Sequence, residues 1–159
     1  GMMEFRPEAL DLGRLCGSVL DEARAAHGTA RHQVRLAAET PVLDGQFDEK
    51  LVRHVLGNLL GNAIKYSPEG GDVVLRVRVH EGQAELAVED QGIGIPPAEI
   101  PHLFTSFHRA SNVGEIKGTG LGLAIVKRSV DLHRGAIAVD SAPGAGTRFT
   151  VRLPLGAST

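Results

Sequence analysis

Residues 48–68 carry the pattern that most constrains how this chain can fold, because they are typical of one long amphipathic helix. Apolar side chains recur there at helical spacing, so one side of the helix should pack on a core. These are Leu51, Val52, Val55, Leu56, Leu59, Leu60, Ala63 and Ile64. Asp48 is the expected N-cap, and Pro68 with the Gly70-Gly71 pair should stop the helix near Tyr66.

The opposite side of this helix carries residues that weaken helices, namely Gly57, Asn58, Gly61 and Asn62. Together they cost about 3 kcal/mol relative to alanine, a large share of the stability of a typical domain. A ligand that docks along the stripe explains this cost better than chance surface choices do. Asn58 and Asn62 lie one turn apart, and their amides suit a hard cation or a phosphate oxygen.

Composition predicts one soluble domain with a sizeable core, from 159 residues of which 42% are hydrophobic and 23% charged. The net charge of -2 gives no electrostatic reason to expect a nucleic acid or direct membrane contact. Cys16 is the only cysteine, which excludes an internal disulfide and fits a reducing compartment. The seven histidines show no zinc-ligand spacing. Together with the absence of a signal or membrane-span pattern, this predicts a cytoplasmic domain.

The remaining pattern alternates helices and strands along the chain. Two further helices are expected at 11–27 and 120–132, and strands at 33–39, 42–43, 73–79, 84–90, 136–140 and 147–153. The two strands at 73–79 and 84–90 should form an antiparallel hairpin. We therefore expect an α+β two-layer sandwich, with about three helices on one face of a mixed, mostly antiparallel sheet of about five strands.

A carboxylate and two glycines mark the end of the strand at 84–90. A carboxylate at Asp90 can accept a hydrogen bond from the exocyclic amine of adenine, whereas it would repel the O6 of guanine. Gly92 and Gly94 permit a tight turn and a close backbone approach to a ligand. Alone, this short motif equally fits an ordinary turn.

A glycine-rich stretch, 118–122, opens the last helix and offers a second ligand-binding feature. Backbone N–H groups at such a helix start suit phosphate. The stretch follows a loop and lacks both the Rossmann spacing and the Walker lysine, and a simple hinge is the alternative. The loop before it, 91–117, is long enough to suggest a function. Within that loop, Phe104 is expected in the core, and Arg109 faces either solvent or phosphate.

Together these segments resemble the catalytic, ATP-binding domain of bacterial sensor histidine kinases, a Bergerat-fold domain shared with gyrase, mismatch-repair and chaperone ATPases. The segment 58–67 resembles the N box of that family, and Asp90-x-Gly92-x-Gly94 its first glycine box. Phe104-x-x-Phe107 resembles the F box, 118–123 the second glycine box, and 144–147 a weaker third. The likeness covers nearly the whole chain. It implies a catalytic domain at residues 5–155, with a tag remnant or linker at 1–4 and a tail at 156–159.

The resemblance also implies ligands and roles. Asn62 would bind Mg²⁺ on the phosphates of ATP, with Asn58 in support. Lys65 would lie near the phosphates and Tyr66 against the adenine, whose amine Asp90 would read. Arg109 would approach the γ-phosphate, from a flexible ATP lid at about 97–117. Further nucleotide-binding residues implied by the family are Gly92, Gly94, Lys117, Gly118, Thr119, Gly120, Leu121, Gly122 and Thr147.

One departure from the family's sequence pattern bears on whether the domain hydrolyses ATP or transfers its phosphoryl group. Hydrolysing relatives carry a glutamate four residues before the first N-box asparagine, where this chain has His54. A histidine can act as a base, yet the change favours phosphoryl transfer to a histidine over stand-alone hydrolysis. The alternatives are an ATP-driven clamp of the gyrase or chaperone type, an anti-sigma-factor-type serine kinase, and a nucleotide-sensing module without activity.

The resemblance implies partners that this chain does not contain. The substrate histidine would lie on a separate dimerisation domain of the same protein, and a response regulator would act downstream. None of the seven histidines lies in the sequence context of such a substrate. The fragment is therefore expected to bind ATP without phosphorylating itself, and the parent protein to be a sensor of the cytoplasm or the inner membrane.

Overall fold

The computed structural model describes residues 4–27, 32–39, 44–95, 97–104 and 121–155. Seven strands, three α-helices and one 3-10 helix are assigned in this part of the chain. They run in the order β1 (Glu8–Asp11), α1 (Leu12–His27), β2 (His32–Ala38), β3 (Asp44–Phe47), α2 (Glu49–Lys65), β4 (Gly71–His80), β5 (Gln83–Asp90), η1 (Pro97–His102), α3 (Leu121–Leu132), β6 (Ala136–Ser141) and β7 (Thr147–Pro154).

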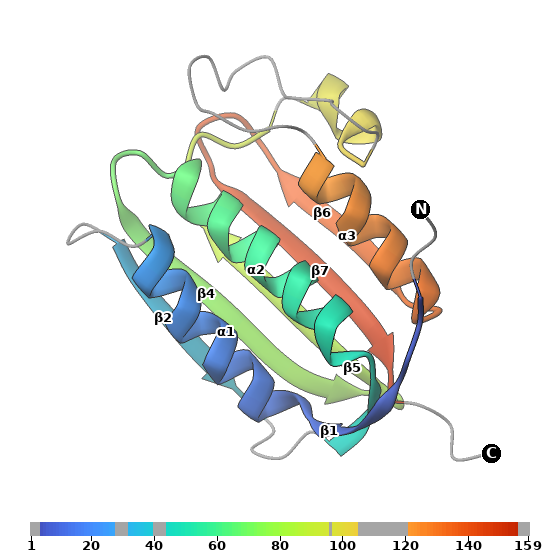
Figure 1. Cartoon of the computed structure of the whole chain (residues 1–159). Helices are drawn as coiled ribbons and strands as arrows, with labels where there is room; N and C mark the ends of the chain where they lie inside the picture. The colour runs from blue at the N-terminus through green and yellow to red at the C-terminus, as the bar shows by residue number, and fades with distance from the viewer. Residues whose placement is uncertain (1–3, 28–31, 40–43, 96, 105–120, 156–159) are drawn as a thin grey trace.

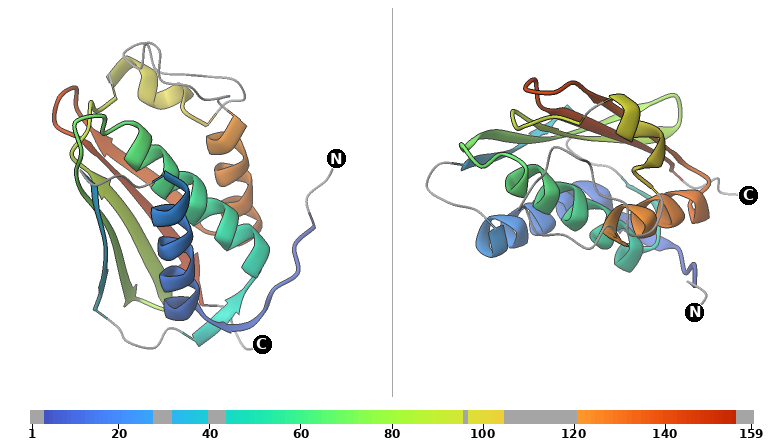
Figure 2. Two further views of the ribbon diagram at one scale, coloured as in Figure 1. Left: turned by 60° about the vertical axis from the view of Figure 1, so that its left-hand side comes forward. Right: turned by 90° about the horizontal axis from the view of Figure 1, so that it is seen from above.

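Five strands form the main sheet, in the order β2-β4-β5-β7-β6. The pair β2–β4 is parallel, and the other three pairs are antiparallel. The helices α1, α2 and α3 lie side by side on one face of this sheet (Figures 1 and 2). The predicted two-layer α+β sandwich with a mixed, mostly antiparallel sheet is confirmed, and so is the hairpin of β4 and β5.

Helix α2 forms as its sequence predicts. The side chain of Asp48 caps it by accepting the backbone N–H of Leu51 at 3.1 Å, and Tyr66 is its C-cap. Its apolar residues are all buried, and Leu56 and Leu60 are completely so. Gly61, which the pattern placed on the polar stripe, is buried as well. The helix thus lies between α1 and α3 with its apolar side on the sheet (Figure 1).

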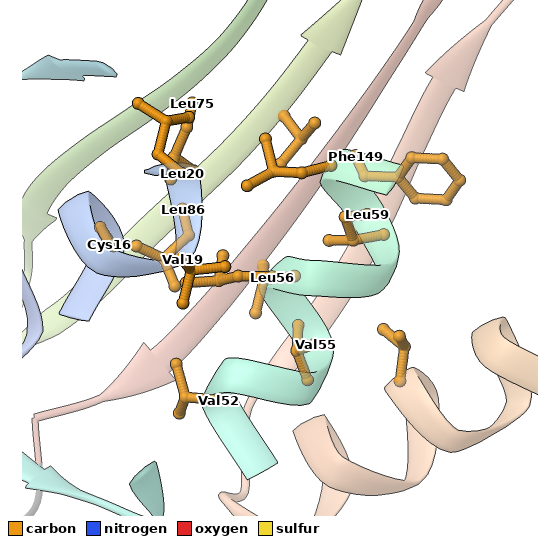
Figure 3. Packing of buried hydrophobic residues seen from close by; sticks show 14 of the residues in the cluster. Cys16, Val19, Leu20, Val52, Val55, Leu56, Leu59, Leu75, Leu86 and Phe149 are labelled. Atoms are coloured by element: carbon orange, nitrogen blue, oxygen red, sulfur yellow. The ribbon is translucent and has the colours of Figure 1, made fainter. Parts of the chain in front are cut away.

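The core fills the space between the helices and the sheet. Leu56 and Leu59 of α2 point toward the strands, and Val19 and Leu20 of α1 pack beside them (Figure 3). Leu75 of β4 and Leu86 of β5 complete the core from the sheet side and are fully buried. Because alternate residues of a strand face opposite sides, these strands leave their polar residues on the other face.

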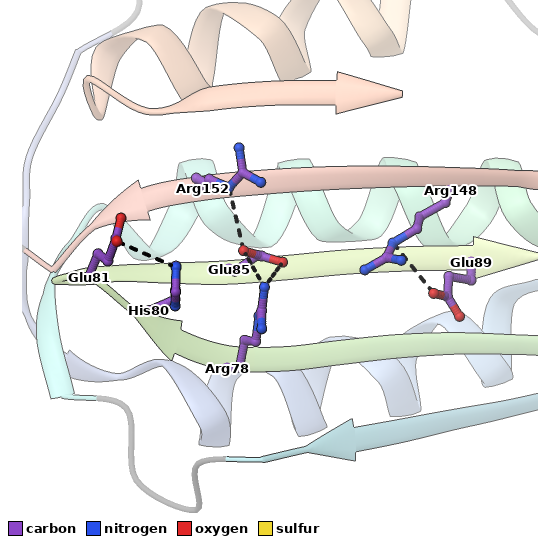
Figure 4. A network of polar contacts seen from close by, with 7 residues as sticks. All are labelled: Arg78, His80, Glu81, Glu85, Glu89, Arg148 and Arg152. Carbon is purple, nitrogen blue, oxygen red and sulfur yellow. Dashed lines mark hydrogen bonds and ion pairs between the residues drawn. The ribbon is translucent and has the colours of Figure 1, made fainter. Parts of the chain in front are cut away.

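The uncovered face of the sheet carries a ladder of ion pairs across β4, β5 and β7 (Figure 4). Glu85 is only 5% exposed and pairs with Arg78 at 3.1 Å and Arg152 at 3.4 Å. Burial disfavours its ionised form, but hydrogen bonds and charges from the two guanidinium groups outweigh burial and lower the pKa of Glu85. The ladder therefore holds three neighbouring strands in register by paired charges.

A second, small sheet was not predicted. The N-terminal strand β1 pairs antiparallel with β3, whereas the sequence predicted no strand before residue 33. The short strand expected at 42–43 lies outside the described residues, and β3 begins just after it at Asp44. Two backbone hydrogen bonds join this region to the helix layer. The backbone N–H of Arg6 donates to the Asp48 carboxylate at 2.8 Å, and the backbone N–H of Asp48 donates to Nε2 of His133 at 3.1 Å.

Candidate functional site

The predicted site segments meet at one end of the sandwich. Helix α2 ends there, β5 ends there, the turn between β6 and β7 lies there, and α3 begins there (Figures 1 and 2). Since these segments are distant in the sequence, only the fold brings them together. A recess of about 1170 Å³ lies at the opposite end, lined by Phe5, Leu10 and His133 among others, and contains none of the predicted residues.

Asn58 and Asn62 lie on α2 and are half-buried. The amide nitrogen of Asn58 lies 2.9 Å from the backbone carbonyl of His54 and 3.0 Å from Nε2 of its ring. Burial lowers the pKa of His54, which favours the neutral imidazole. No group of three or more His, Cys, Asp or Glu side chains that could hold a metal occurs among the described residues. A cation in this region would therefore rely on amide oxygens and on the phosphates themselves.

Lys65 and Tyr66 end the same helix. Lys65 is exposed in the last turn, so its ammonium is accessible to an anion. Tyr66 is half-buried, and its backbone N–H donates to the carbonyl of Asn62 at 2.8 Å. The next residue, Ser67, is buried and closes the helix by donating its hydroxyl to the Ala63 carbonyl at 2.8 Å.

Asp90 lies at the end of β5 with its carboxylate partly buried. The carboxylate accepts the backbone N–H of Gly92 at 2.9 Å and also that of Thr147. Burial raises the pKa of Asp90 to about 6, although these two backbone hydrogen bonds act in the opposite direction. A half-desolvated acceptor of this kind is suited to a buried N–H donor such as an adenine amine.

The first glycine pair fits tightly against the protein's own backbone. A β-carbon on Gly92 would lie 2.0 Å from the carbonyl oxygen of Tyr66, and one on Gly94 would lie 1.9 Å from that of Ala142. Gly94 also has a φ of +74°, in the left-handed region that favours glycine. The close approach that the sequence assigned to a ligand is thus made, in this structure, by the end of α2 and by the β6–β7 turn.

Thr147 supports Asp90 from the first position of β7. It is buried, it is the strand partner of Asp90, and its hydroxyl shares a 2.8 Å hydrogen bond with Ser141. Ser141 also accepts the backbone N–H of Ile95 at 2.7 Å. Ser141 was not predicted, because a serine before an Ala-Pro-Gly turn looks like an ordinary turn residue.

The remaining predicted residues fall largely outside the described structure. Helix α3 begins at Leu121, with Gly122 in its first turn, as the glycine-rich pattern predicts. Phe104 lies in the described part and packs edge-on to Phe149 with ring centres 6.4 Å apart, as the core interpretation predicts. The residues outside it are Phe107, Arg109, Lys117, Gly118, Thr119 and Gly120.

The chain is similar in sequence to known proteins over most of its length. The family described as Histidine kinase-, DNA gyrase B-, and HSP90-like ATPase matches residues 47–157. The phosphate regulon sensor protein PhoR of Pseudomonas aeruginosa is 38% identical over 150 residues, which cover 91% of this chain and 32% of PhoR. The sensor histidine kinase WalK of Bacillus subtilis is 36% identical over 157 residues, covering 95% of this chain and 25% of WalK.

Solved structures agree with these sequence matches. The mycobacterial sensor histidine kinase MprB superimposes with a TM-score of 0.81 at 34% identity, covering 92% of this chain and 97% of that one. Full-length ShkA in complex with AMPPNP gives a TM-score of 0.85 at 26% identity, covering 100% of this chain and 33% of ShkA. This chain thus matches nearly the whole of the solved MprB chain, but only part of the longer ShkA chain.

The fold and these matches define a catalytic domain of the nucleotide-binding α+β class. The chain belongs to the histidine kinase-, DNA gyrase B-, and HSP90-like ATPase family, and within it to the catalytic ATP-binding domains of sensor histidine kinases. It spans only 32% of PhoR and 25% of WalK, so those proteins contain further parts that this chain does not match. Among the described helices, none has the length and apolar character needed to cross a bilayer.

Proposed function

We propose that this domain binds Mg·ATP at the end of α2 and transfers the γ-phosphoryl group to a histidine on a separate dimerisation domain. The observation that carries this proposal is that α2, which holds Asn58 and Asn62, and β5, which holds Asp90, end on the same side of the sandwich. The three side chains come from two elements and are only partly buried. They therefore remain accessible to a ligand that spans from a base to a triphosphate.

At the adenine end of the proposed site lie Asp90 and the residues that hydrogen-bond to its carboxylate. The carboxylate would accept the adenine amine, while Gly92 and Thr147 hold it in place through their backbone N–H groups. Tyr66, at the C-cap of α2, would cover the base with its ring. The site would discriminate against guanine, because the guanine O6 and the Asp90 carboxylate are both acceptors and no hydrogen would lie between them.

The phosphate end of the site is the outer side of α2. Asn62 would hold Mg²⁺ through its amide oxygen, with the oxygen of Asn58 in support, and Lys65 would contact the phosphates. These residues fit the ion, since neutral amide oxygens suit a magnesium ion already bound to phosphate. When bound, Mg²⁺ neutralises charge on the triphosphate. The chain's own part is to position the nucleotide, with Arg109 and residues 117–122 as the further expected contacts.

Phosphotransfer is tested by mixing this chain with a histidine-bearing dimerisation domain of a sensor kinase and [γ-³²P]ATP. Label that appears on that domain, is lost in acid and disappears after His→Gln substitution of the acceptor supports the proposal. Acid-stable label on serine would indicate a serine kinase instead. Steady release of phosphate by this chain alone would indicate an ATPase clamp. A response regulator is then the expected acceptor of the phosphoryl group from the labelled histidine.

A further inference from the structure

His54 and Asn58 form a hydrogen-bonded pair whose orientation is determined by the backbone. A carbonyl oxygen can only accept hydrogen bonds, so the amide atom that lies 2.9 Å from the His54 carbonyl must be the nitrogen of Asn58. The same nitrogen lies 3.0 Å from Nε2 of the His54 ring. That ring nitrogen must therefore accept, and the ring proton must be on Nδ1.

The pairing uses the whole donor capacity of Asn58. An amide NH₂ has two hydrogens, and both are directed at residue 54. What Asn58 can offer to a ligand is then its carbonyl oxygen, the atom that suits a cation or a donor group. An amide that rotated by half a turn would present its NH₂ instead and would repel a cation. The ring of His54 thus adds a second acceptor, beside the backbone carbonyl, that holds the amide with its oxygen away from residue 54.

We propose that His54 is a positioning residue, which acts as a fixed hydrogen-bond acceptor and holds the Asn58 oxygen toward the magnesium and triphosphate of the bound nucleotide. This inference rests on the proposed function. It also assigns His54 a role other than that of a base: the Nε2 lone pair is already engaged by Asn58 and is not available to take a proton from water. The neutral ring that this role needs is consistent with the partial burial of His54.

Two substitutions at His54 distinguish loss of the hydrogen-bond acceptor from loss of the imidazole ring itself. His54→Leu keeps the bulk and removes the acceptor, whereas His54→Gln offers an amide oxygen in its place. Affinities for Mg·ATP and for adenosine are measured by calorimetry on the 159-residue chain. We expect His54→Leu to weaken Mg·ATP binding about tenfold, the effect of one lost hydrogen bond, and His54→Gln to stay within about threefold of wild type. Adenosine affinity should not change in either variant.

His80→Leu is the matched control, because it makes the same substitution at an exposed histidine on β4. It should bind Mg·ATP as the wild type does. Nitrogen-15 spectra of the wild-type imidazole provide a measurement that needs no variant: His54 should carry its proton on Nδ1. A spectrum with the proton on Nε2 would overturn the inference.

The binding data distinguish four other outcomes. Wild-type affinity in His54→Leu, or an equal loss in both His54 variants, would contradict the acceptor role and leave the proposed function standing. A parallel loss of adenosine affinity would reveal a general structural role and would also contradict it. Failure of the wild-type chain to bind Mg·ATP would overturn the proposed function and the inference together.

Discussion

The α-carbon of Gly92 lies against the carbonyl oxygen of Tyr66, so closely that an added β-carbon would be 2.0 Å from it. The same carbonyl accepts the backbone N–H of Ile93 at 3.0 Å. The first glycine motif is therefore joined to the end of α2 by direct backbone packing. This contact fixes the position of Asp90 relative to the end of α2, the helix that carries Asn58 and Asn62.

Substitution of Gly92 should damage both stability and the site. A methyl group would push β5 away from α2, and such overpacking costs about 1–3 kcal/mol in a well-packed region. Gly57→Ala is the matched control, because a β-carbon there would meet nothing within 4 Å. In a helix interior, that exchange should stabilise the domain by up to about 1 kcal/mol. Urea unfolding of both variants checks this, and a Gly92→Ala protein as stable as wild type would contradict it.

Asp90 should make the free energy of unfolding fall as the pH rises. Burial raises its pKa from 3.8 to about 6 in the folded state, so folding favours the protonated form. The stabilisation is fully present below the unfolded pKa and is lost as the pH rises through about 6. Over that window the loss amounts to roughly 3 kcal/mol at most.

Comparison of the wild type with Asp90→Asn isolates this effect from other groups that titrate in the same range. The difference in unfolding free energy between the two proteins should change between pH 4 and pH 7 in favour of the variant. The variant should at the same time lose adenine selectivity, because it lacks the carboxylate acceptor. A difference that does not vary with pH would show that Asp90 titrates normally.

Cys16 should be unreactive in the folded domain. It is completely buried in α1, and burial together with the charge of Asp11 raises the pKa of its thiol to about 12. A thiol reagent at pH 8 should therefore react only as fast as the domain opens, and at the normal rate in denaturant. Rapid modification of the folded protein would contradict this.

Asp48 should matter more than its position at a helix end suggests. Its carboxylate caps α2 through Leu51 and also accepts the backbone N–H of Arg6, which ties the N-terminal segment to α2. Asp48→Ala should cost at least about 1–2 kcal/mol, the usual value of a lost cap. Asp131→Ala, which removes an exposed pair with Lys127, should cost less than about 1 kcal/mol. Thermal unfolding of the two variants measures the contrast, and equal losses would contradict it.

Most elements of the fold could be predicted because their patterns are local. The spacing of apolar residues in α2 and their alternation with polar residues in β4 and β5 predict which side chains are buried. The structure confirms these elements. Strand β1 was missed because its pairing with β3 is a long-range event that four residues cannot signal. The buried position of Gly61 was missed for the same reason, since it depends on how α2 is oriented against its neighbours.

For the candidate site, the sequence predicts residue types but not how those residues pack. A carboxylate and glycines at a strand end indicated a ligand site, but the sequence could not show that Gly92 and Gly94 pack on the protein's own carbonyls. Nor could it show that Ser141 and Thr147 support Asp90, because that link crosses from β6 to β7. The pair of His54 and Asn58 follows from spacing in a helix, yet its orientation is visible only in the structure.

Calorimetric titration of this chain with ATP, in magnesium and then with a chelator, tests the central claim most directly. The account predicts binding of one nucleotide that weakens strongly when Mg²⁺ is removed. It also predicts that Asn62→Ala binds Mg·ATP about 10- to 100-fold more weakly than wild type, with a melting temperature no lower than that of wild type. Absence of binding, or binding that neither the chelator nor the Asn62→Ala substitution alters, would contradict the assignment of a Mg·ATP site to the end of α2.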